Sequence, residues 1–176
     1  EIGQSHEFLV QDPGANEQRT ILLESASITS TPVQNVGTVS TETGEVGYIL
    51  FNDHIATSEA GLINAINQLK TKNIADLVLD LRYNGGGFLD IANELAFMIA
   101  GPQLAEGAIF EELKFNDKHP TFDPVTDRLL SPMLFHTSSR GFSVGAGQPL
   151  PFLNLSRVFV ITGPGTCSAS ESIING

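Results

Sequence analysis

The chain has 176 residues, of which 41% are hydrophobic, and carries a formal net charge of −11. The acidic balance argues against a nucleic-acid partner, because such binding depends on Lys and Arg neutralising phosphates. No apolar run approaches the roughly 20 residues of a membrane-spanning helix, and the single cysteine, Cys167, permits no internal disulfide.

The chain begins with a polar segment over residues 1–20. Asp12, Pro13 and Gly14 indicate a turn, and residues 20–28 (TILLESASI) predict a strand. Residues 29–43 are rich in Ser, Thr, Val and Pro, a composition typical of a linker or an extended arm.

Strands and helices alternate from Glu45 onward. Apolar runs predict strands at 45–51, 77–81, 109–115 and 158–161. The run at 77–81 is of the kind that helices cover on both faces of a parallel sheet. Helical spacing predicts one helix capped by Ser58 and a second at 89–99 that Gly101 and Pro102 stop. With a long excursion at 116–155 and a last helix opening near Ser168, this order implies a layered α/β fold.

The candidate reactive groups lie at two corners, each formed where a strand turns into a helix. The first follows 77–81 and contains Gly85, Gly86 and Gly87; the second follows 158–161 and leads to Ser168. The first N–H groups of a helix are unpaired and point toward whatever lies in front of them. A serine hydroxyl and bare backbone amides are the minimal parts of an acyl-transfer site, so we expect the two corners to face the same carbonyl.

The segments LVLDLRYNGGG (77–87) and VFVITGPGTCSASE (158–171) together resemble the C-terminal-processing, or tail-specific, peptidases, a family of serine proteases. The resemblance covers roughly residues 44–176. It implies a catalytic core of the layered β-β-α type found in Clp protease and crotonase, usually preceded by a PDZ domain. On this basis residues 1–40 are expected to be the tail of a PDZ-like domain with a linker. Residues 41–176 would be a partial catalytic core, truncated on its C-terminal side.

The same resemblance implies a role for each site residue. Ser168 would be the nucleophile, and the oxyanion hole would combine the amide of Ala169 with that of Gly86 or, as second choice, Gly87. Ser170 would be a helix cap or a supporting hydroxyl. The family's general base is a lysine beyond the serine, at a position past the last residue of this chain. We therefore expect the intact protein to cut protein C-terminal regions without a cofactor, and this chain alone to be inactive.

Further expectations concern the location of the protein in the cell and its binding partners. Such peptidases usually work in the periplasm or at the cell envelope, and the substrate is a protein or peptide. Without the missing strands, an exposed apolar strand edge would make the chain prone to self-association.

Several residues also have simpler interpretations. Ser168 could cap a helix, Glu171 suits the positive end of a helix, and Asp80 is expected to bond nearby backbone. Cys167 is expected to be a small buried residue. Of the histidines, only His54, just after a strand, is worth testing as a stand-in base.

Three classes of function remain open. The first is the serine peptidase, and the second is a non-catalytic relative that binds a peptide or hydrophobic ligand. The third is a crotonase-like acyl-CoA enzyme, which the acidic charge disfavours. Phosphate binding by the glycines is disfavoured too, because their spacing matches neither common nucleotide motif.

Overall fold

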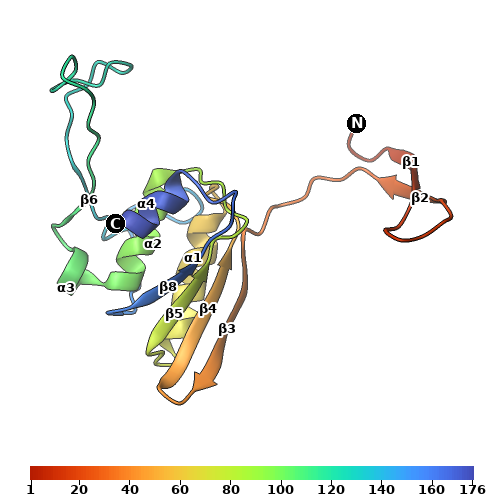
Figure 1. Cartoon of the computed structure of the whole chain (residues 1–176), viewed down its shortest axis with the longest axis horizontal. Helices are drawn as coiled ribbons and strands as arrows, with labels where there is room; N and C mark the ends of the chain where they lie inside the picture. The colour runs from red at the N-terminus through yellow and green to blue at the C-terminus, as the bar shows by residue number, and fades with distance from the viewer. The chain divides into compact units, whose positions relative to one another are not determined.

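The structure is a computed structural model that describes all 176 residues, and it divides them into two compact units, residues 1–30 and 31–176. The first unit is an antiparallel hairpin of β1 (Ser5–Val10) and β2 (Arg19–Glu24) (Figure 1). In the connecting turn the Ala15 N–H donates to the Asp12 carbonyl at 3.0 Å, and Arg19 pairs with the Asp12 carboxylate at 2.8 Å. The predicted turn is confirmed, and the strand predicted at 20–28 forms over the range of β2.

The second unit is built on a four-stranded sheet in the order β3-β4-β5-β8 (Figure 1). The strand β3 (Val33–Thr41) runs antiparallel to β4 (Gly44–Phe51), whereas β5 (Asp76–Asp80) runs parallel to both β4 and β8 (Val158–Ile161). Residues 29–43, expected to be a linker or an extended arm, are therefore extended, but from Val33 onward they form β3 rather than a free linker. The polar side chains of β3 suit an edge strand that faces solvent.

Helices follow the predicted pattern closely. The four helices are α1 (Ser58–Lys70), α2 (Leu89–Ala100), α3 (Pro102–Ala105) and α4 (Ala169–Asn175). Ser58 does not act as the expected N-cap, because it is already the first helical residue. Its hydroxyl donates to the Asp53 carbonyl at 2.6 Å and accepts the Ile55 N–H at 3.2 Å, which closes the turn before α1.

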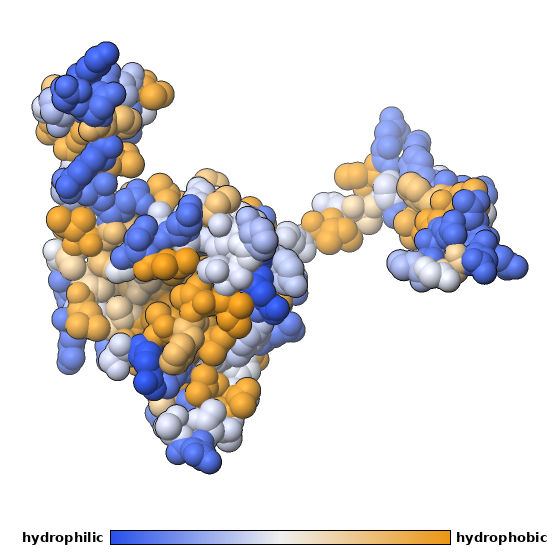
Figure 2. All heavy atoms as spheres, in the orientation of Figure 1, coloured by the Kyte–Doolittle hydropathy of each residue, from blue (hydrophilic) through white to orange (hydrophobic).

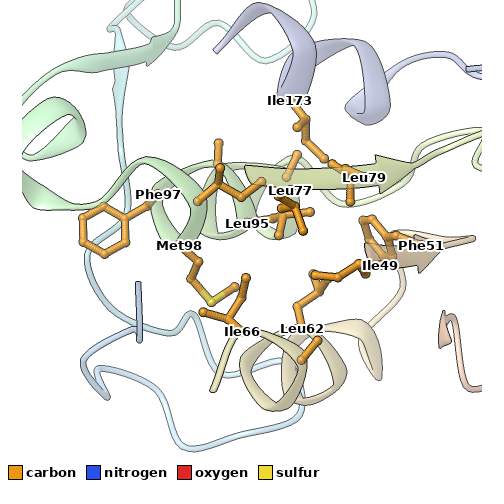
Figure 3. Close-up of a cluster of buried hydrophobic side chains, with 14 of the residues drawn as sticks. Ile49, Phe51, Leu62, Ile66, Leu77, Leu79, Leu95, Phe97, Met98 and Ile173 are labelled. Atoms are coloured by element: carbon orange, nitrogen blue, oxygen red, sulfur yellow. The ribbon is translucent and has the colours of Figure 1, made fainter. Parts of the chain in front are cut away.

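One face of the sheet forms the hydrophobic core. Side chains that alternate along β4 and β5 point into a single cluster, to which α1, α2 and α4 each add buried residues (Figure 3). The cluster includes Ile49, Phe51, Leu62, Ile66, Leu77, Leu79, Leu95, Met98 and Ile173. Tyr48, Leu50 and Val78 lie on the opposite face and are only partly buried. The mixed α/β fold is confirmed, and the cover of helices over both faces of the sheet stays a prediction.

The long excursion begins and ends in a short ladder. Strand β6 (Ile109–Glu111) pairs antiparallel with β7 (Met133–Leu134), so the strand predicted at 109–115 is shorter than expected. The chain between them projects from the unit, as the green-to-teal segment of Figure 1 shows. After β7 the chain returns along α1 and α2 before it enters β8.

Strand β8 is an exposed edge of the sheet. Phe159 is 49% exposed, and Val158 and Ile161 are each 38% exposed. A cavity of about 410 Å³ opens beside it, lined by apolar residues that include Leu79, Val160 and Ile173. Figure 2 shows apolar side chains gathered over this part of the molecule. Self-association through this edge stays a prediction. None of the helices has the length and apolar character needed to cross a membrane.

Candidate active site

Ser168 has a strained backbone. It lies between the turn that follows β8 and the first residue of α4, with φ 58° and ψ −123°. L-residues rarely adopt positive φ, and Asn and Asp tolerate it best. The other non-glycine residues with positive φ are all of those two types: Asn35, Asn73, Asp127 and Asn154. Strain of this kind persists only where the surroundings hold it, and it concentrates at functional sites.

Hydrogen bonds on both sides of Ser168 hold this conformation. Its N–H donates to Glu171 Oε2 at 2.9 Å, and the Glu171 N–H returns a bond to the Ser168 carbonyl at 2.8 Å. The structural role expected for Glu171 is confirmed. Before the serine, the Thr166 hydroxyl donates to the Leu81 carbonyl at 2.7 Å and accepts the Gly163 N–H at 2.9 Å. The serine corner is therefore tied to the end of β5.

The two predicted corners meet. A Cβ placed on Gly86 would lie only 2.7 Å from Ser168 Cβ and 3.0 Å from the Ala169 nitrogen, so the contact requires glycine. The Cys167 thiol donates to the Gly85 carbonyl at 3.1 Å. Cys167 is exposed rather than buried as expected, because it faces outward beside this contact. The glycine corner and the serine corner are therefore in contact, as predicted.

Backbone amides at the contact differ in their bonding. The Ala169 N–H begins α4 and has no acceptor within the chain, as expected for the first residue of a helix. The Gly87 N–H also has no acceptor within the chain. The Gly86 N–H, in contrast, donates to Asn84 Oδ1 at 3.0 Å. The N–H groups of Ala169 and Gly87 are thus without an acceptor in the chain, whereas that of Gly86 is occupied by Asn84.

Asn84 is the most heavily bonded residue of the glycine corner, and sequence reasoning missed it. It is fully buried. Its Oδ1 also lies 2.9 Å from His54 Nδ1, and its Nδ2 donates to the Phe51 carbonyl at 3.0 Å. Its own carbonyl accepts the Ser170 hydroxyl at 3.1 Å. The only signal in the sequence is its place immediately before the three glycines.

His54 is placed as a support and not as a base. Its ring is fully buried against Phe51, with the two ring centroids 4.4 Å apart. Burial lowers the pKa of His54 to about 4, outweighing the hydrogen bond to Asn84. A group with so low a pKa is a weak proton acceptor at neutral pH.

Asp80 and Arg82 form a second support at the end of β5. The Arg82 N–H and guanidinium donate to the Asp80 carboxylate, the shortest contact being 2.6 Å, and the Tyr48 hydroxyl donates to it at 2.7 Å. The hydrogen bonds from Arg82 lower the pKa of Asp80 to about 2, despite its burial. The backbone bond expected for Asp80 is confirmed, and bonds from the side chains of Arg82 and Tyr48 add to it.

Two buried glutamates hold the chain that passes behind the glycine corner. Glu59 of α1 accepts the N–H groups of Gly141, Ser143 and Val144 at 2.6–3.0 Å. Burial alone would raise the pKa of Glu59, but these amides outweigh it and lower the pKa. Glu94 of α2 accepts the Arg140 N–H at 2.7 Å.

Glu94 has the opposite shift. Burial, together with the nearby Glu59 carboxylate, raises the pKa of Glu94 to about 8. Its second oxygen is buried without an N–H donor. An unpaired, buried oxygen beside a second carboxylate favours the protonated form of Glu94, in keeping with its raised pKa. The sequence held a signal for this residue, because Glu94 lies on the buried face of α2 between Ile91 and Met98.

No cluster of three or more His, Cys, Asp or Glu side chains is arranged to hold a metal ion. No lysine contact reaches the serine corner either. Lys70 lies 4.8 Å from the ring centre of Phe152, and Lys114 pairs with Glu112 at 3.1 Å.

Comparison with known proteins bears on these features. The sequence model of peptidase family S41 matches residues 45–175. A carboxyl-terminal-processing protease of Picosynechococcus sp. is 26% identical over 146 residues, a match that covers 82% of this chain and 35% of that protein.

Two solved structures share the fold. A Bacteroides fragilis protein assigned to the S41 proteases superposes with a TM-score of 0.66 at 24% identity, covering 99% of this chain and 45% of that one. The photosystem II D1 C-terminal processing protease superposes with a TM-score of 0.53 at 20% identity, covering 99% and 41%. The chain thus spans between about a third and a half of the length of these relatives.

Proposed function

Because the chain belongs to peptidase family S41, we propose that it carries the acylation site of a serine endopeptidase that cuts proteins in their C-terminal regions. The observation that carries the proposal is Ser168, strained and exposed, in contact with Gly86 and beside the unpaired amide of Ala169. The printed names of the relatives support the choice of C-terminal regions.

The geometry supports an acyl-enzyme route. Ser168 Oγ attacks the scissile carbonyl carbon and gives up its proton to a general base. The N–H groups of Ala169 and Gly87 stabilise the negative charge that develops on the carbonyl oxygen. Collapse breaks the C–N bond, the base returns the proton to the leaving amine, and water then hydrolyses the ester.

The general base in this proposal is a lysine outside these 176 residues. An unactivated serine hydroxyl is a poor nucleophile, and a positioned base typically contributes 10²–10⁴-fold. Lys70 and Lys114 make their contacts elsewhere, and the relatives named above are about two to three times as long as this chain. The 176-residue chain alone is therefore expected to be inactive.

A fluorophosphonate probe tests the proposal. In a longer form of the protein that continues past residue 176, the probe should label the wild type and fail on Ser168→Ala. Ser172→Ala is the matched control, because Ser172 lies on the same helix but bonds Glu111 at 2.8 Å. It should label normally.

Other results have defined meanings. Equal labelling of Ser168→Ala and wild type would remove the serine assignment. An unlabelled wild type that still binds C-terminal peptides would favour the non-catalytic alternative.

Residues 1–30 are proposed to be the tail of a PDZ-like domain, since they form a unit of their own. This puts β3 with the catalytic core rather than with the linker. Limited proteolysis should cut first near residues 25–32, where no strand or helix is formed. First cleavage inside β3 would contradict this boundary. Periplasmic or envelope localisation stays a prediction, which cell fractionation tests.

A further inference from the structure

We propose that Asn84, held in place by His54, is a positioning residue that turns the Gly86 N–H inward and so makes Gly87 the second oxyanion donor. The inference rests on the proposed function for its catalytic meaning. Its structural part concerns which way the N–H groups of Gly86, Gly87 and Ala169 point, and this can be tested on a chain that has no enzymatic activity.

The orientation of the Asn84 side chain follows from its partners. Nδ2 faces the Phe51 carbonyl at 3.0 Å, and a carbonyl can only accept, so this atom is the amide nitrogen. The other atom, Oδ1, is then an acceptor for both the Gly86 N–H and His54. Both ends of the side chain are therefore occupied, and a flip would set like atoms against each other at each end.

The same reasoning fixes the tautomer of His54. Because Asn84 Oδ1 can only accept, His54 Nδ1 carries the proton and Nε2 keeps its lone pair. His54 Nε2 is buried without a hydrogen-bond partner. Protonation there would bury an N–H with no acceptor, so the neutral ring is the stable form, in keeping with the low pKa of His54.

The backbone of His54 fixes the next peptide unit. Its N–H donates to the Gly86 carbonyl at 3.2 Å, and its carbonyl accepts the Phe88 N–H at 2.9 Å. In a trans peptide the carbonyl and the following N–H point in opposite directions. Since the Gly86 carbonyl points at His54, the Gly87 N–H points away from it.

The peptide unit between Gly85 and Gly86 is also held at both ends, but it points in the opposite direction. The Gly86 N–H points at Asn84, and the Gly85 carbonyl on the opposite side accepts the Cys167 thiol of the serine corner. Two consecutive peptide units are therefore held in alternate directions. The first directs its carbonyl, and not its N–H, toward the serine corner, which leaves the N–H of the second unit as the available donor.

Asn84 also connects to the other donor. Its carbonyl accepts the hydroxyl of Ser170, the residue next to Ala169. Asn84 therefore positions both proposed oxyanion donors, Gly87 through its side chain and Ala169 through its backbone carbonyl. Since a donor must lie within 2.7–3.1 Å of the oxyanion, small displacements of this residue should affect the rate rather than substrate binding.

Amide hydrogen exchange on the 176-residue chain tests the structural part. The Gly86 N–H should be protected, whereas those of Gly87 and Ala169 should exchange rapidly. Asn84→Ala should remove the protection of Gly86. The matched control is Asn93→Ala, because Asn93 is equally buried but bonds the backbone of Leu134 and His136. It should leave Gly86 protected. Protection of Gly87, or of Gly86 in Asn84→Ala, would overturn the inference.

Kinetics on a longer, active form test the catalytic part. Loss of an oxyanion donor costs about 10²–10³-fold in kcat, so displacement of one in Asn84→Ala should lower kcat about 10–100-fold and change KM less than about threefold. His54→Asn retains a donor near the position of Nδ1 and should keep most of the rate, whereas His54→Leu should behave like Asn84→Ala. An equal fall in Asn93→Ala, or no fall in Asn84→Ala, would overturn the positioning role.

The two proposals fail differently. If Ser168-dependent labelling is absent, the proposed peptidase function is wrong, and with it the catalytic meaning of Asn84. If labelling is present but the exchange pattern is reversed, the function stands and the assignment of Gly87 is wrong.

Discussion

The two corners of the site are built in opposite ways. The glycine corner follows the central strand β5 and rests on the buried side chains of Asn84 and His54. The serine corner follows the edge strand β8, and Ser168 itself is exposed and strained. The contrast teaches that the two halves of one site can be stabilised differently. The glycine corner is fixed by buried side chains, whereas the exposed residue proposed as the nucleophile is held in a strained conformation by hydrogen bonds of its own backbone and of its neighbours.

The largest effect is expected at the glycine corner. In Gly87→Ala the new Cβ would lie 2.4 Å from the His54 carbonyl oxygen, at a φ of 136°. Both the clash and the conformation oppose the change, so unfolding free energy should fall by about 3 kcal/mol or more. Gly165→Ala is the control, since its Cβ meets nothing within 4 Å, and urea unfolding should show little change. An equal fall in unfolding free energy at both positions would show that the glycine corner is no more tightly packed than the serine corner.

Substitutions on β5, which leads to the glycine corner, should destabilise the chain more than substitutions on β8, which leads to the serine corner. Leu79 on β5 is fully buried, whereas Phe159 on β8 is 49% exposed. Leu79→Ala should cost about 3 kcal/mol of unfolding free energy because it leaves a cavity. Phe159→Ala should cost less than about 1 kcal/mol, even though it removes a larger side chain. Similar costs in thermal or urea unfolding would mean that β8 is covered in solution.

The support behind the glycine corner should depend on pH. The loop that Glu59 and Glu94 bind includes Phe142, whose ring centre lies 4.7 Å from that of Phe88, the residue after Gly87. Glu94 has an ordinary pKa of 4.5 when unfolded and about 8 when folded. The folded chain therefore binds the extra proton between these values. The contribution of protonated Glu94 to the free energy of unfolding is complete below pH 4.5. It falls by at most about 1.4 kcal/mol per pH unit as the pH rises toward 8.

Glu94→Gln isolates that contribution. A glutamine stays neutral, can donate to Glu59 and can still accept the Arg140 N–H. The difference in unfolding free energy between the variant and the wild type should therefore change between pH 5 and pH 8, in favour of the variant at high pH. A difference that is constant across this range would show that Glu94 is ionised in the folded chain.

The smallest predicted effect concerns the strain at Ser168. Ser168→Gly removes the Cβ that makes φ 58° and ψ −123° unfavourable, whereas Ser168→Ala keeps it. The glycine variant should be about 1 kcal/mol more stable than the alanine variant, after the greater freedom of glycine in the unfolded chain is allowed for. Equal stability of the two variants, measured by urea unfolding, would mean that Ser168 is not strained.

Sequence patterns predicted the parts of this structure that depend on local periodicity. The strand at 45–51, the helix that follows it and the second helix, which ends just before Gly101, all form within a residue or two of their predicted bounds. Two predictions were incomplete for different reasons. The polar side chains of β3 concealed an edge strand that pairs with β4, the next strand in the chain, whereas the exposure of Cys167 depends on its contact with the glycine corner, which is distant in sequence.

The sequence by itself determined the order of strands and helices, the two corners and the family, because turn chemistry and apolar spacing are written in consecutive residues. Only the tertiary structure decided that Gly86 turns its N–H to Asn84 and that Gly87 leaves its own unpaired. It also decided that burial beside Glu59 raises the pKa of Glu94. The reason is physical: the direction of a peptide group and the pKa of a buried carboxyl are set by atoms that folding brings in from other segments.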